Sequence, residues 1–204
     1  MKKNIIIDAD DVLIDSISLM NKFHNERYGT TFVVSDYCSF VFSDFLGITQ
    51  EQVRENEILL YQSEMHIEMQ AKKGAVQAID YLSKNYGLVV ATGRKVCNEK
   101  YLLETLSRLY KKHHFISVHH LGIEPNSLNH PKAKWQLAKE IDSPLIIDDY
   151  QNHLIQGAIN NIYGLLMTMP WNKYIIDLPK LVTRVRNWEE AVDVIEKKKE
   201  LIWK

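Results

Sequence analysis

The chain has 204 residues, of which 46% are hydrophobic and 25% charged, so it can bury the core of an ordinary domain and is not expected to be disordered. Its formal net charge of −1 argues against the strongly basic surface of a nucleic-acid-binding protein. The two cysteines, Cys38 and Cys97, stand far apart and outside any CxxC pattern, which favours a reducing compartment. No apolar stretch is long enough for a signal-peptide core or a spanning helix, so we expect a cytoplasmic protein without membrane contact.

Short apolar segments alternate with amphipathic helical patterns from residue 75 onward. Their near-continuous apolar character is typical of strands that are covered on both faces, as in a parallel sheet. This alternation predicts an α/β fold with a doubly wound, Rossmann-like parallel sheet. The expected strands cover residues 4–8, 88–92, 115–118, 145–148 and 162–167.

Local signals mark the ends of several expected helices. Gly87 stands where the C-cap of the helix that starts near residue 75 is expected. Asn98 suits the N-cap of the next helix, and Pro131 suits the first turn of a third. A final amphipathic helix is expected over residues 188–204.

The interval between the first two expected strands is too long for a single crossover helix. Apolar residues at helical spacing predict one helix within residues 12–23 and another within residues 53–69, with an aromatic stretch at 37–45 between them. We interpret residues 12–73 as a helical cap inserted over the carboxyl edge of the sheet. The remaining residues, 1–11 and 74–204, then form the catalytic core.

Four polar clusters follow the expected strands or stand in the turns after them. In an open α/β sheet this edge is where ligands bind. Buried carboxylates in two of the clusters would repel one another unless a cation compensates, and Mg²⁺ prefers oxygen ligands. The clusters are Asp8 with Asp10 and Asp11, Thr92 with Gly93 and Arg94, Lys132 with Lys134, and Asp148 with Asp149.

Each cluster also has a purely structural explanation when it is taken alone. A DxD sequence is common in turns and at helix N-caps, and Thr-Gly-Arg is an ordinary exit from a strand. Lys134 alone is most often a solvated surface side chain, and an acid pair can simply begin a helix. Their order favours a joint functional role: acid pair, small hydroxyl, lysine and acid pair, each following a strand.

In this order the clusters resemble the four motifs of the haloacid dehalogenase-like (HAD) phosphohydrolase superfamily, over nearly the whole chain. The segments that carry the resemblance are IIIDADDVL for the first motif, VVATGR for the second, Lys134 for the third and LIIDD for the fourth. The resemblance implies a HAD fold and a Mg²⁺-dependent phosphatase that hydrolyses phosphate monoesters through an aspartyl-phosphate intermediate.

The resemblance also implies roles for single residues. Asp8 would be the nucleophile and Asp10 the general acid/base. Thr92 would hydrogen-bond the transferring phosphoryl group, and Lys134 would neutralise the charge on that group and on the nucleophile. The implied Mg²⁺ ligands are Asp8, Asp149 and the backbone carbonyl of Asp10, with Asp148 as a supporting catalytic residue.

Two positions leave a choice open. Asp11 stands where the family usually has glycine, and aspartate tolerates left-handed backbone better than most residues, so we expect the turn to be kept. Lys132 and Lys134 both stand near the start of a helix. We favour Lys134 for its spacing to Asp148, and Lys132 is the alternative.

The aromatic stretch of the cap bears on the choice of substrate. Nucleic-acid bases stack on aromatic faces, so we expect Phe40, Phe42 and Phe45 to include substrate-binding residues, although packing inside the cap is the commoner fate of such side chains. Gly93 and Arg94 are further candidates, because a guanidinium can fork a phosphate or a carboxylate. The alternative for Arg94 is a salt bridge to the cap or to Asp148.

Two segments near the C-terminus are similar to the 5′(3′)-deoxyribonucleotidase branch of the superfamily: MPWN at 169–172 and VRNWEE at 185–190. The similarity implies a 5′-nucleotidase that acts on (deoxy)nucleoside monophosphates, with a small phosphorylated molecule as its partner. A homodimer is compatible with the sequence, and nucleic acid is expected only as a strand-end substrate.

Other functions fit parts of the pattern. A 3′-phosphatase on polynucleotide ends shares the Gly93–Arg94 pair, but the near-neutral charge speaks against a basic groove. A sugar-phosphate phosphatase shares the same chemistry. A signalling phospho-acceptor domain also combines an acid pair, a threonine and a lysine. In that class a lone aspartate ends a later strand, and none does so at 88–92 or 115–118.

Overall fold

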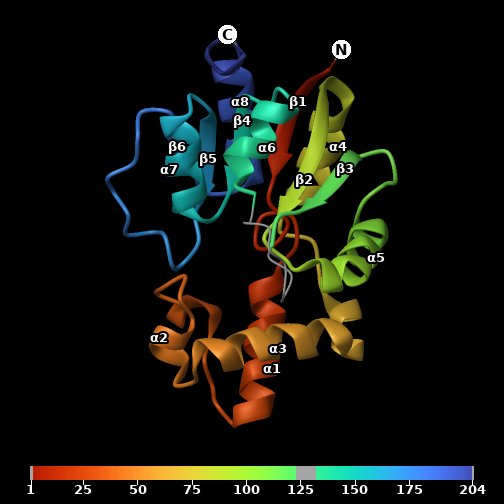
Figure 1. Ribbon diagram of the computed structural model, residues 1–204, viewed down its shortest axis with the longest axis vertical. Coiled ribbons are helices and arrows are strands. Elements are labelled where there is room, and N and C mark those ends of the chain that lie inside the picture. The colour runs from red at the N-terminus through yellow and green to blue at the C-terminus, as the bar shows by residue number, and fades with distance from the viewer. Residues whose placement is uncertain (1, 123–131, 204) are drawn as a thin grey trace.

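The computed structural model describes residues 2–122 and 132–203 of the chain. Within them, six parallel strands form one sheet in the order β3-β2-β1-β4-β5-β6 (Figure 1). This arrangement confirms the predicted doubly wound parallel sheet. The strands are β1 (Lys3–Ile7), β2 (Tyr86–Thr92), β3 (Phe115–His120), β4 (Leu145–Asp148), β5 (Tyr163–Met167) and β6 (Val182–Val185).

The edge strand β6 was not expected from the sequence. It is only four residues long, and Thr183 and Arg184 at its centre are partly exposed, so it lacks the apolar run that marks the inner strands. An edge strand has a neighbour on one side only, and polar side chains there cost little.

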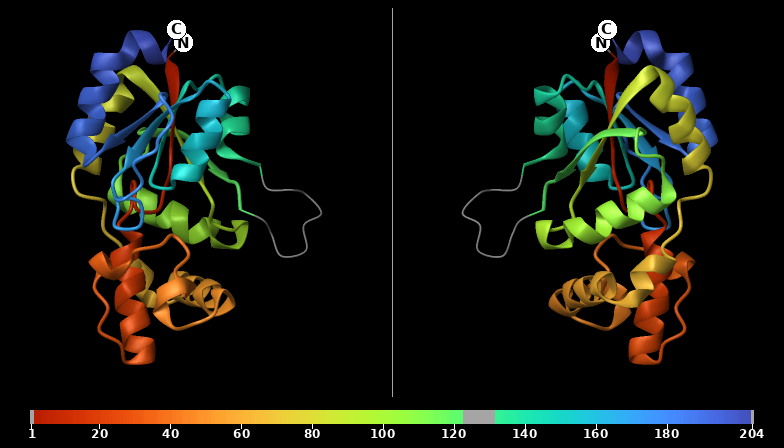
Figure 2. Two further views of the ribbon diagram at one scale, coloured as in Figure 1. Left: turned by 90° about the vertical axis from the view of Figure 1, so that its left-hand side faces the viewer. Right: turned by 90° about the vertical axis from the view of Figure 1, so that its right-hand side faces the viewer.

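Helices cover both faces of the sheet, as the apolar strands require (Figure 2). In β1, Ile5 and Ile7 pack into one core with α4, α5 and α8, whereas Ile6 packs into a second core with α6 and α7. Among the described residues no helix is both long and apolar enough to cross a membrane. The helices are α4 (Ala75–Asn85), α5 (Glu99–Leu109), α6 (Lys134–Glu140), α7 (Gln151–Ile159) and α8 (Trp188–Ile202).

The centre of the sheet is the point at which the strand order reverses. Strand β1 pairs with β2 on one side and with β4 on the other. Directly after β1, the backbone N–H of Asp8 donates to the carbonyl of Ile147 at 2.9 Å. The carboxyl ends of β1, β2 and β4 therefore meet at one place, which is where open α/β sheets bind ligands.

The segment between β1 and β2 is helical and lies beyond the carboxyl ends of the strands (Figures 1 and 2). This placement agrees with the expected cap, while the boundaries at residues 12 and 73 remain a prediction. The elements of the segment are α1 (Ser16–Tyr28), the 3-10 turn η1 (Val34–Asp36), α2 (Ser43–Leu46), α3 (Gln50–Gln62) and the 3-10 turn η2 (Glu64–Glu68).

The ends of these elements differ from the expectation in two places. Helix α1 begins at Ser16, because the residues before it form the turns that follow the first strand. The helix expected within residues 53–69 is two elements, since Ser63 adopts an extended conformation after α3 and its side chain accepts from the backbone N–H of Met65 at the start of η2.

Of the three expected end signals, Gly87 is wrong, Asn98 is confirmed as an N-cap, and Pro131 is not tested. Gly87 lies within β2, and α4 ends at Asn85; a Cβ at position 87 would lie 2.5 Å from Asn4 Oδ1 of the neighbouring strand, so glycine there permits close packing. Asn98 is the N-cap of α5, yet its side chain makes no capping hydrogen bond. Helix α6 begins at Lys134, and Pro131 lies outside the described residues.

Candidate active site

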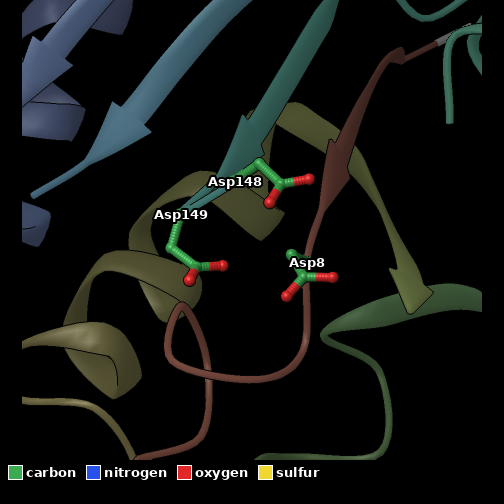
Figure 3. A group of neighbouring side chains, drawn as sticks. All are labelled: Asp8, Asp148 and Asp149. Atoms are coloured by element: carbon green, nitrogen blue, oxygen red, sulfur yellow. The ribbon is translucent and has the colours of Figure 1, made fainter. Parts of the chain in front are cut away.

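Three buried carboxylates converge where β1 and β4 end (Figure 3). Asp8 follows β1, Asp148 ends β4, and Asp149 follows it. One carboxylate oxygen from each of the three lies within 4.8 Å of the others. Their residues are only 6%, 1% and 5% exposed, so water can compensate little of their mutual repulsion.

Lys134 joins two of these carboxylates. Its Nζ donates to Asp148 Oδ2 at 2.7 Å and also to Asp8 Oδ1, and the side chain is buried. The other candidate, Lys132, lies on the surface and pairs with Glu140. The geometry therefore favours Lys134 for the role of the third motif.

The charge balance of the group is visible in its pKa values. Burial raises the pKa of Asp8 to about 7, with Lys134 acting in the opposite direction. Burial and the neighbouring Asp148 carboxylate raise the pKa of Asp149 well above its usual range. For Asp148 itself, burial is outweighed by Lys134 and His153, which hold its pKa low. Three ionised carboxylates would therefore carry more negative charge than one lysine compensates, and in the absence of a cation the raised pKa values favour protonation of Asp8 and Asp149.

This donor set fits a hard divalent cation. Carboxylate oxygens are the ligands that Mg²⁺ takes in proteins, and a dication would supply the missing positive charge. Two neighbours hold the carboxylates in position: Trp171 Nε1 donates to Asp149 Oδ2 at 3.0 Å, and His153 Nδ1 lies 2.9 Å from Asp148 Oδ2. A metal site of this kind depends on such supporting contacts.

The side chain of Asp10 is not part of the group of three carboxylates. It forms a bidentate ion pair with Arg94, with Nε to Oδ2 at 2.7 Å and Nη2 to Oδ1 at 2.5 Å, and Tyr61 donates at 3.3 Å. Although burial opposes it, this pairing lowers the pKa of Asp10. The side chain of Asp10 is therefore engaged by Arg94 and Tyr61.

Arg94 is buried, and its partner differs from those anticipated. Neither the cap nor the last acid pair forms its salt bridge, because the guanidinium forks Asp10 and lies 4.1 Å above the ring of Tyr61. Its Nη1 atom is buried and has no hydrogen-bond partner among the described residues. The same turn holds Thr92, whose Oγ1 accepts from the backbone N–H of Arg94 at 3.1 Å, and Gly93, which leaves open space above the turn.

Asp11 adopts the left-handed backbone that glycine usually supplies, with φ of 59°. Its carboxylate accepts from the backbone N–H of Ile17 at 3.1 Å and from Ser16 Oγ at 3.0 Å, at the start of α1. Lys72 lies 3.4 Å away. Burial raises the pKa of Asp11 to about 6. Asp11 is therefore engaged with the first turn of α1 rather than with the three converging carboxylates.

A cavity of about 390 Å³ opens above these groups and reaches the cap. Phe40 and Phe42 line it, and Phe40 stacks on Tyr150 with ring centroids 3.9 Å apart and planes 16° from parallel. Phe45 does not line the cavity, which corrects the expectation for this residue. It packs against Tyr37 inside the cap, with ring centroids 5.0 Å apart.

Several lining residues were not singled out in the sequence. Tyr150 and His153 follow the fourth motif on the way into α7, and their nearness to the acid pair was the available signal. Trp171 belongs to the MPWN segment, which was noted only for its similarity. Glu57 and Tyr61 stand one turn apart on α3 and carried no signal, because a charged or aromatic residue on a helix usually has a structural explanation.

Solved structures of similar fold come from HAD proteins. A predicted phosphatase from Clostridium acetobutylicum matches with a TM-score of 0.66 at 14% identity, covering 97% of this chain and 99% of that one. A haloacid dehalogenase-like hydrolase from Streptococcus pneumoniae matches with a TM-score of 0.62 at 16% identity, and the match covers 95% of this chain and 98% of that one. The HAD-hydrolase YfnB from Bacillus subtilis, whose structure was solved bound to magnesium, matches with a TM-score of 0.61 at 14% identity. The match covers 95% of this chain and 98% of that one. No curated protein matches the chain.

The parallel sheet and these neighbours define a HAD-type fold. A narrower assignment comes from a family model described as 5′ nucleotidase, deoxy (pyrimidine), cytosolic type C protein (NT5C), which matches residues 2–201. The chain belongs to the NT5C family and is a phosphoric monoester hydrolase.

Proposed function

We propose that this protein is a Mg²⁺-dependent 5′-nucleotidase that hydrolyses (deoxy)nucleoside monophosphates through an aspartyl-phosphate intermediate. The observation that carries the proposal is the Lys134 contact to both Asp8 and Asp148, beside Asp149, at the floor of a cavity with aromatic walls. The family description names deoxy pyrimidine nucleotidases of cytosolic type, which supports both the substrate class and a cytoplasmic location.

In this proposal Asp8 attacks the phosphorus atom and forms the acyl phosphate, which divides one difficult step into two easier ones. Lys134 lies against the nucleophile and neutralises charge on the phosphoryl oxygens, and Thr92 hydrogen-bonds one of them. Asp10 gives a proton to the leaving oxygen and later takes one from the attacking water. Before that transfer, its carboxylate must leave the fork of Arg94, which keeps it ionised, and take up a proton from solvent.

The residues that would hold the metal are Asp8, Asp149 and the backbone carbonyl of Asp10, with Asp148 in support. The bound cation would supply charge neutralisation for the transferring phosphoryl group. Only three side chains contribute, and Mg²⁺ usually keeps several waters in its shell.

The aromatic walls favour a nucleotide over a small sugar phosphate. Phe40, Phe42, Tyr150 and Trp171 line one side of the cavity, and a base can lie against such rings. Stacking of this kind contributes about 1–3 kcal/mol per base in nucleic-acid sites. We propose that residues 12–73 act as the specificity cap over the core.

A substrate screen with purified protein and Mg²⁺ tests the proposal directly. Deoxynucleoside 5′-monophosphates should be hydrolysed with a higher kcat/KM than sugar phosphates or 3′-phosphorylated oligonucleotides. The Asp8→Asn variant should lose roughly 10⁴-fold or more in kcat, because an amide cannot form the acyl phosphate. Near-native turnover by this variant would exclude the covalent route, and a preference for oligonucleotide ends would exclude the nucleotidase assignment.

A further inference from the structure

Helix α3 contributes to the cavity lining one carboxylate that has no role in the reaction proposed above. Four residues of this helix line the cavity at helical spacing: Gln50, Val53, Glu57 and Tyr61. Positions three and four apart share one face of a helix, so this face is directed at the site. Glu57 is the acidic member of that face.

Glu57 differs from the other acidic side chains around it. Each aspartate that lines the cavity has a hydrogen-bond partner: a lysine for Asp8, Arg94 for Asp10, Ser16 for Asp11, and the contacts described above for Asp148 and Asp149. Within residues 2–122 and 132–203, Glu57 makes no hydrogen bond and no ion pair, although its side chain is not fully exposed. A partly buried carboxylate without a partner is costly, which is expected of a group that receives its partner with the ligand.

The place of Glu57 corresponds to the leaving group of the substrate. In-line attack by Asp8 expels the leaving oxygen on the side opposite to the nucleophile, and Asp10 must reach that oxygen. Glu57 lies close enough to Asp10 and Arg94 for their charges to act on its carboxyl group. The part of the substrate that remains after phosphate transfer would therefore lie beside Glu57.

From these observations we propose that Glu57 is a specificity-determining residue. Its carboxylate accepts a hydrogen bond from a hydroxyl or N–H group of an uncharged leaving group, and it excludes leaving groups that carry a second anion. This inference rests on the proposed function, and it narrows the substrate to monophosphates of neutral, hydroxyl-bearing compounds such as nucleosides. Like charges placed together in a site cost several kcal/mol, so the exclusion should be strong.

The surrounding charges support the exclusion of anions. The cavity is lined by six carboxyl groups but by only two permanently charged cations, Arg94 and Lys134. Both cations already have carboxylate partners. A second phosphate or a carboxylate on the leaving group would therefore meet no unpaired cation among the described residues that line the cavity. Arg54 and Lys95, whose charges also act on Glu57, are not part of that lining.

A pair of matched substrates tests the inference. Wild-type protein and the Glu57→Gln variant are assayed with Mg²⁺ on 2′-deoxyuridine 5′-monophosphate and on the same nucleotide phosphorylated at its 3′ hydroxyl, with release of the 5′ phosphate followed by chromatography. Wild type should favour the monophosphate. Because glutamine removes the charge at constant size, the ratio of the two kcat/KM values should fall at least about tenfold in the variant.

The matched control is Glu55→Gln on the same helix, because Glu55 is exposed and faces Arg27 instead of the cavity. This variant should keep the wild-type ratio. The melting temperature of Glu57→Gln should not fall, since no contact within the described residues is lost. If wild type hydrolyses the monophosphate but Glu57→Gln keeps the wild-type ratio, the inference is wrong while the nucleotidase assignment stands. If wild type hydrolyses neither nucleotide but does hydrolyse another phosphate ester, the nucleotidase assignment fails first.

Discussion

At the scale of single residues, the site depends on one lysine that holds two carboxylates together. Lys134 is buried between Asp8 and Asp148, whereas Lys132, two positions earlier, forms an ion pair on the surface. Substitution of Lys134 should therefore reduce activity and stability far more than substitution of Lys132, although the sequence alone left both as candidates.

The Lys134→Met variant should lose at least about 100-fold in kcat, because the charge that neutralises the phosphoryl oxygens is gone. It should also be less stable by about 3–5 kcal/mol, since two buried carboxylates lose their partner. Lys132→Met is the matched control and should remain within about twofold of wild type, because exposed ion pairs contribute little. Steady-state kinetics and urea unfolding of both variants measure these effects. Equal losses in the two variants would contradict the assignment.

Asp8 should also make the stability of the metal-free protein depend on pH. Its pKa is about 7 in the folded chain, against an ordinary value of 3.8. Between these two values the folded state binds more protons than the unfolded state, so the contribution of Asp8 to stability rises as the pH falls from 8 to 5.

Thermal unfolding of wild type and Asp8→Asn, both without divalent metal, isolates this contribution. The melting temperature of wild type, relative to the variant, should rise on going from pH 8 to pH 5, because the amide does not titrate in this range. Groups remote from Asp8, including the buried histidines, cancel in the difference. Asp149, whose pKa the Asp8 charge helps to raise, changes the difference in the same direction. A constant difference across this range would show that the pKa of Asp8 is not raised.

At the scale of elements, the cap divides its aromatic side chains between two tasks. Phe40 lies on the cavity wall against Tyr150, and Phe45 lies in the small core that the cap forms with Tyr37. The sequence places both residues in one aromatic stretch, and it cannot separate them because the short helix α2 has no long amphipathic period.

Substitution by alanine should separate the two tasks. Phe40→Ala should raise KM for a deoxynucleotide several-fold more than it raises KM for p-nitrophenyl phosphate, because only the nucleotide has a base to stack. Phe45→Ala should instead lower the free energy of unfolding by up to about 3 kcal/mol, through the lost packing. Kinetics and chemical denaturation on both variants are the measurements. Loss of stability in both, without any change in substrate preference, would remove the aromatic wall as a base-binding surface.

Much of this architecture could be predicted from the sequence. Apolar runs in the sequence predict the buried strands, and each of the four polar clusters follows such a run or stands at the start of the next helix. The contact between Asp10 and Arg94 could not be predicted, because it joins side chains from two turns, and neither turn has a periodic pattern that fixes side-chain direction. Glu57 was missed for a similar reason: a single acid on a helix becomes informative only when the face that it shares is seen to cover a cavity.

At the scale of the whole molecule, the convergence of acids predicts a strong effect of divalent metal. A chelator should abolish the phosphatase activity and excess Mg²⁺ should restore it. Ca²⁺, which has a larger and less regular coordination shell, should restore little of the activity. Mg²⁺ should also raise the melting temperature, because it binds the folded site and relieves the repulsion among Asp8, Asp148 and Asp149. Full activity after exhaustive chelation would contradict the metal requirement.

The position of β1 in the sheet has a consequence for folding during synthesis. Strand β1 is the first of the six strands of this sheet to be synthesised and lies at its centre, yet Ile6 pairs with Ile146, a partner that is synthesised 140 residues later. Until that partner emerges, one edge of β1 has no neighbouring strand, and Asp8 has neither Lys134 nor the acid pair at the end of β4 beside it. Contacts between such distant segments form slowly and late. A nascent chain that stops short of β4 should therefore be aggregation-prone and without activity, however much of the cap it has already made.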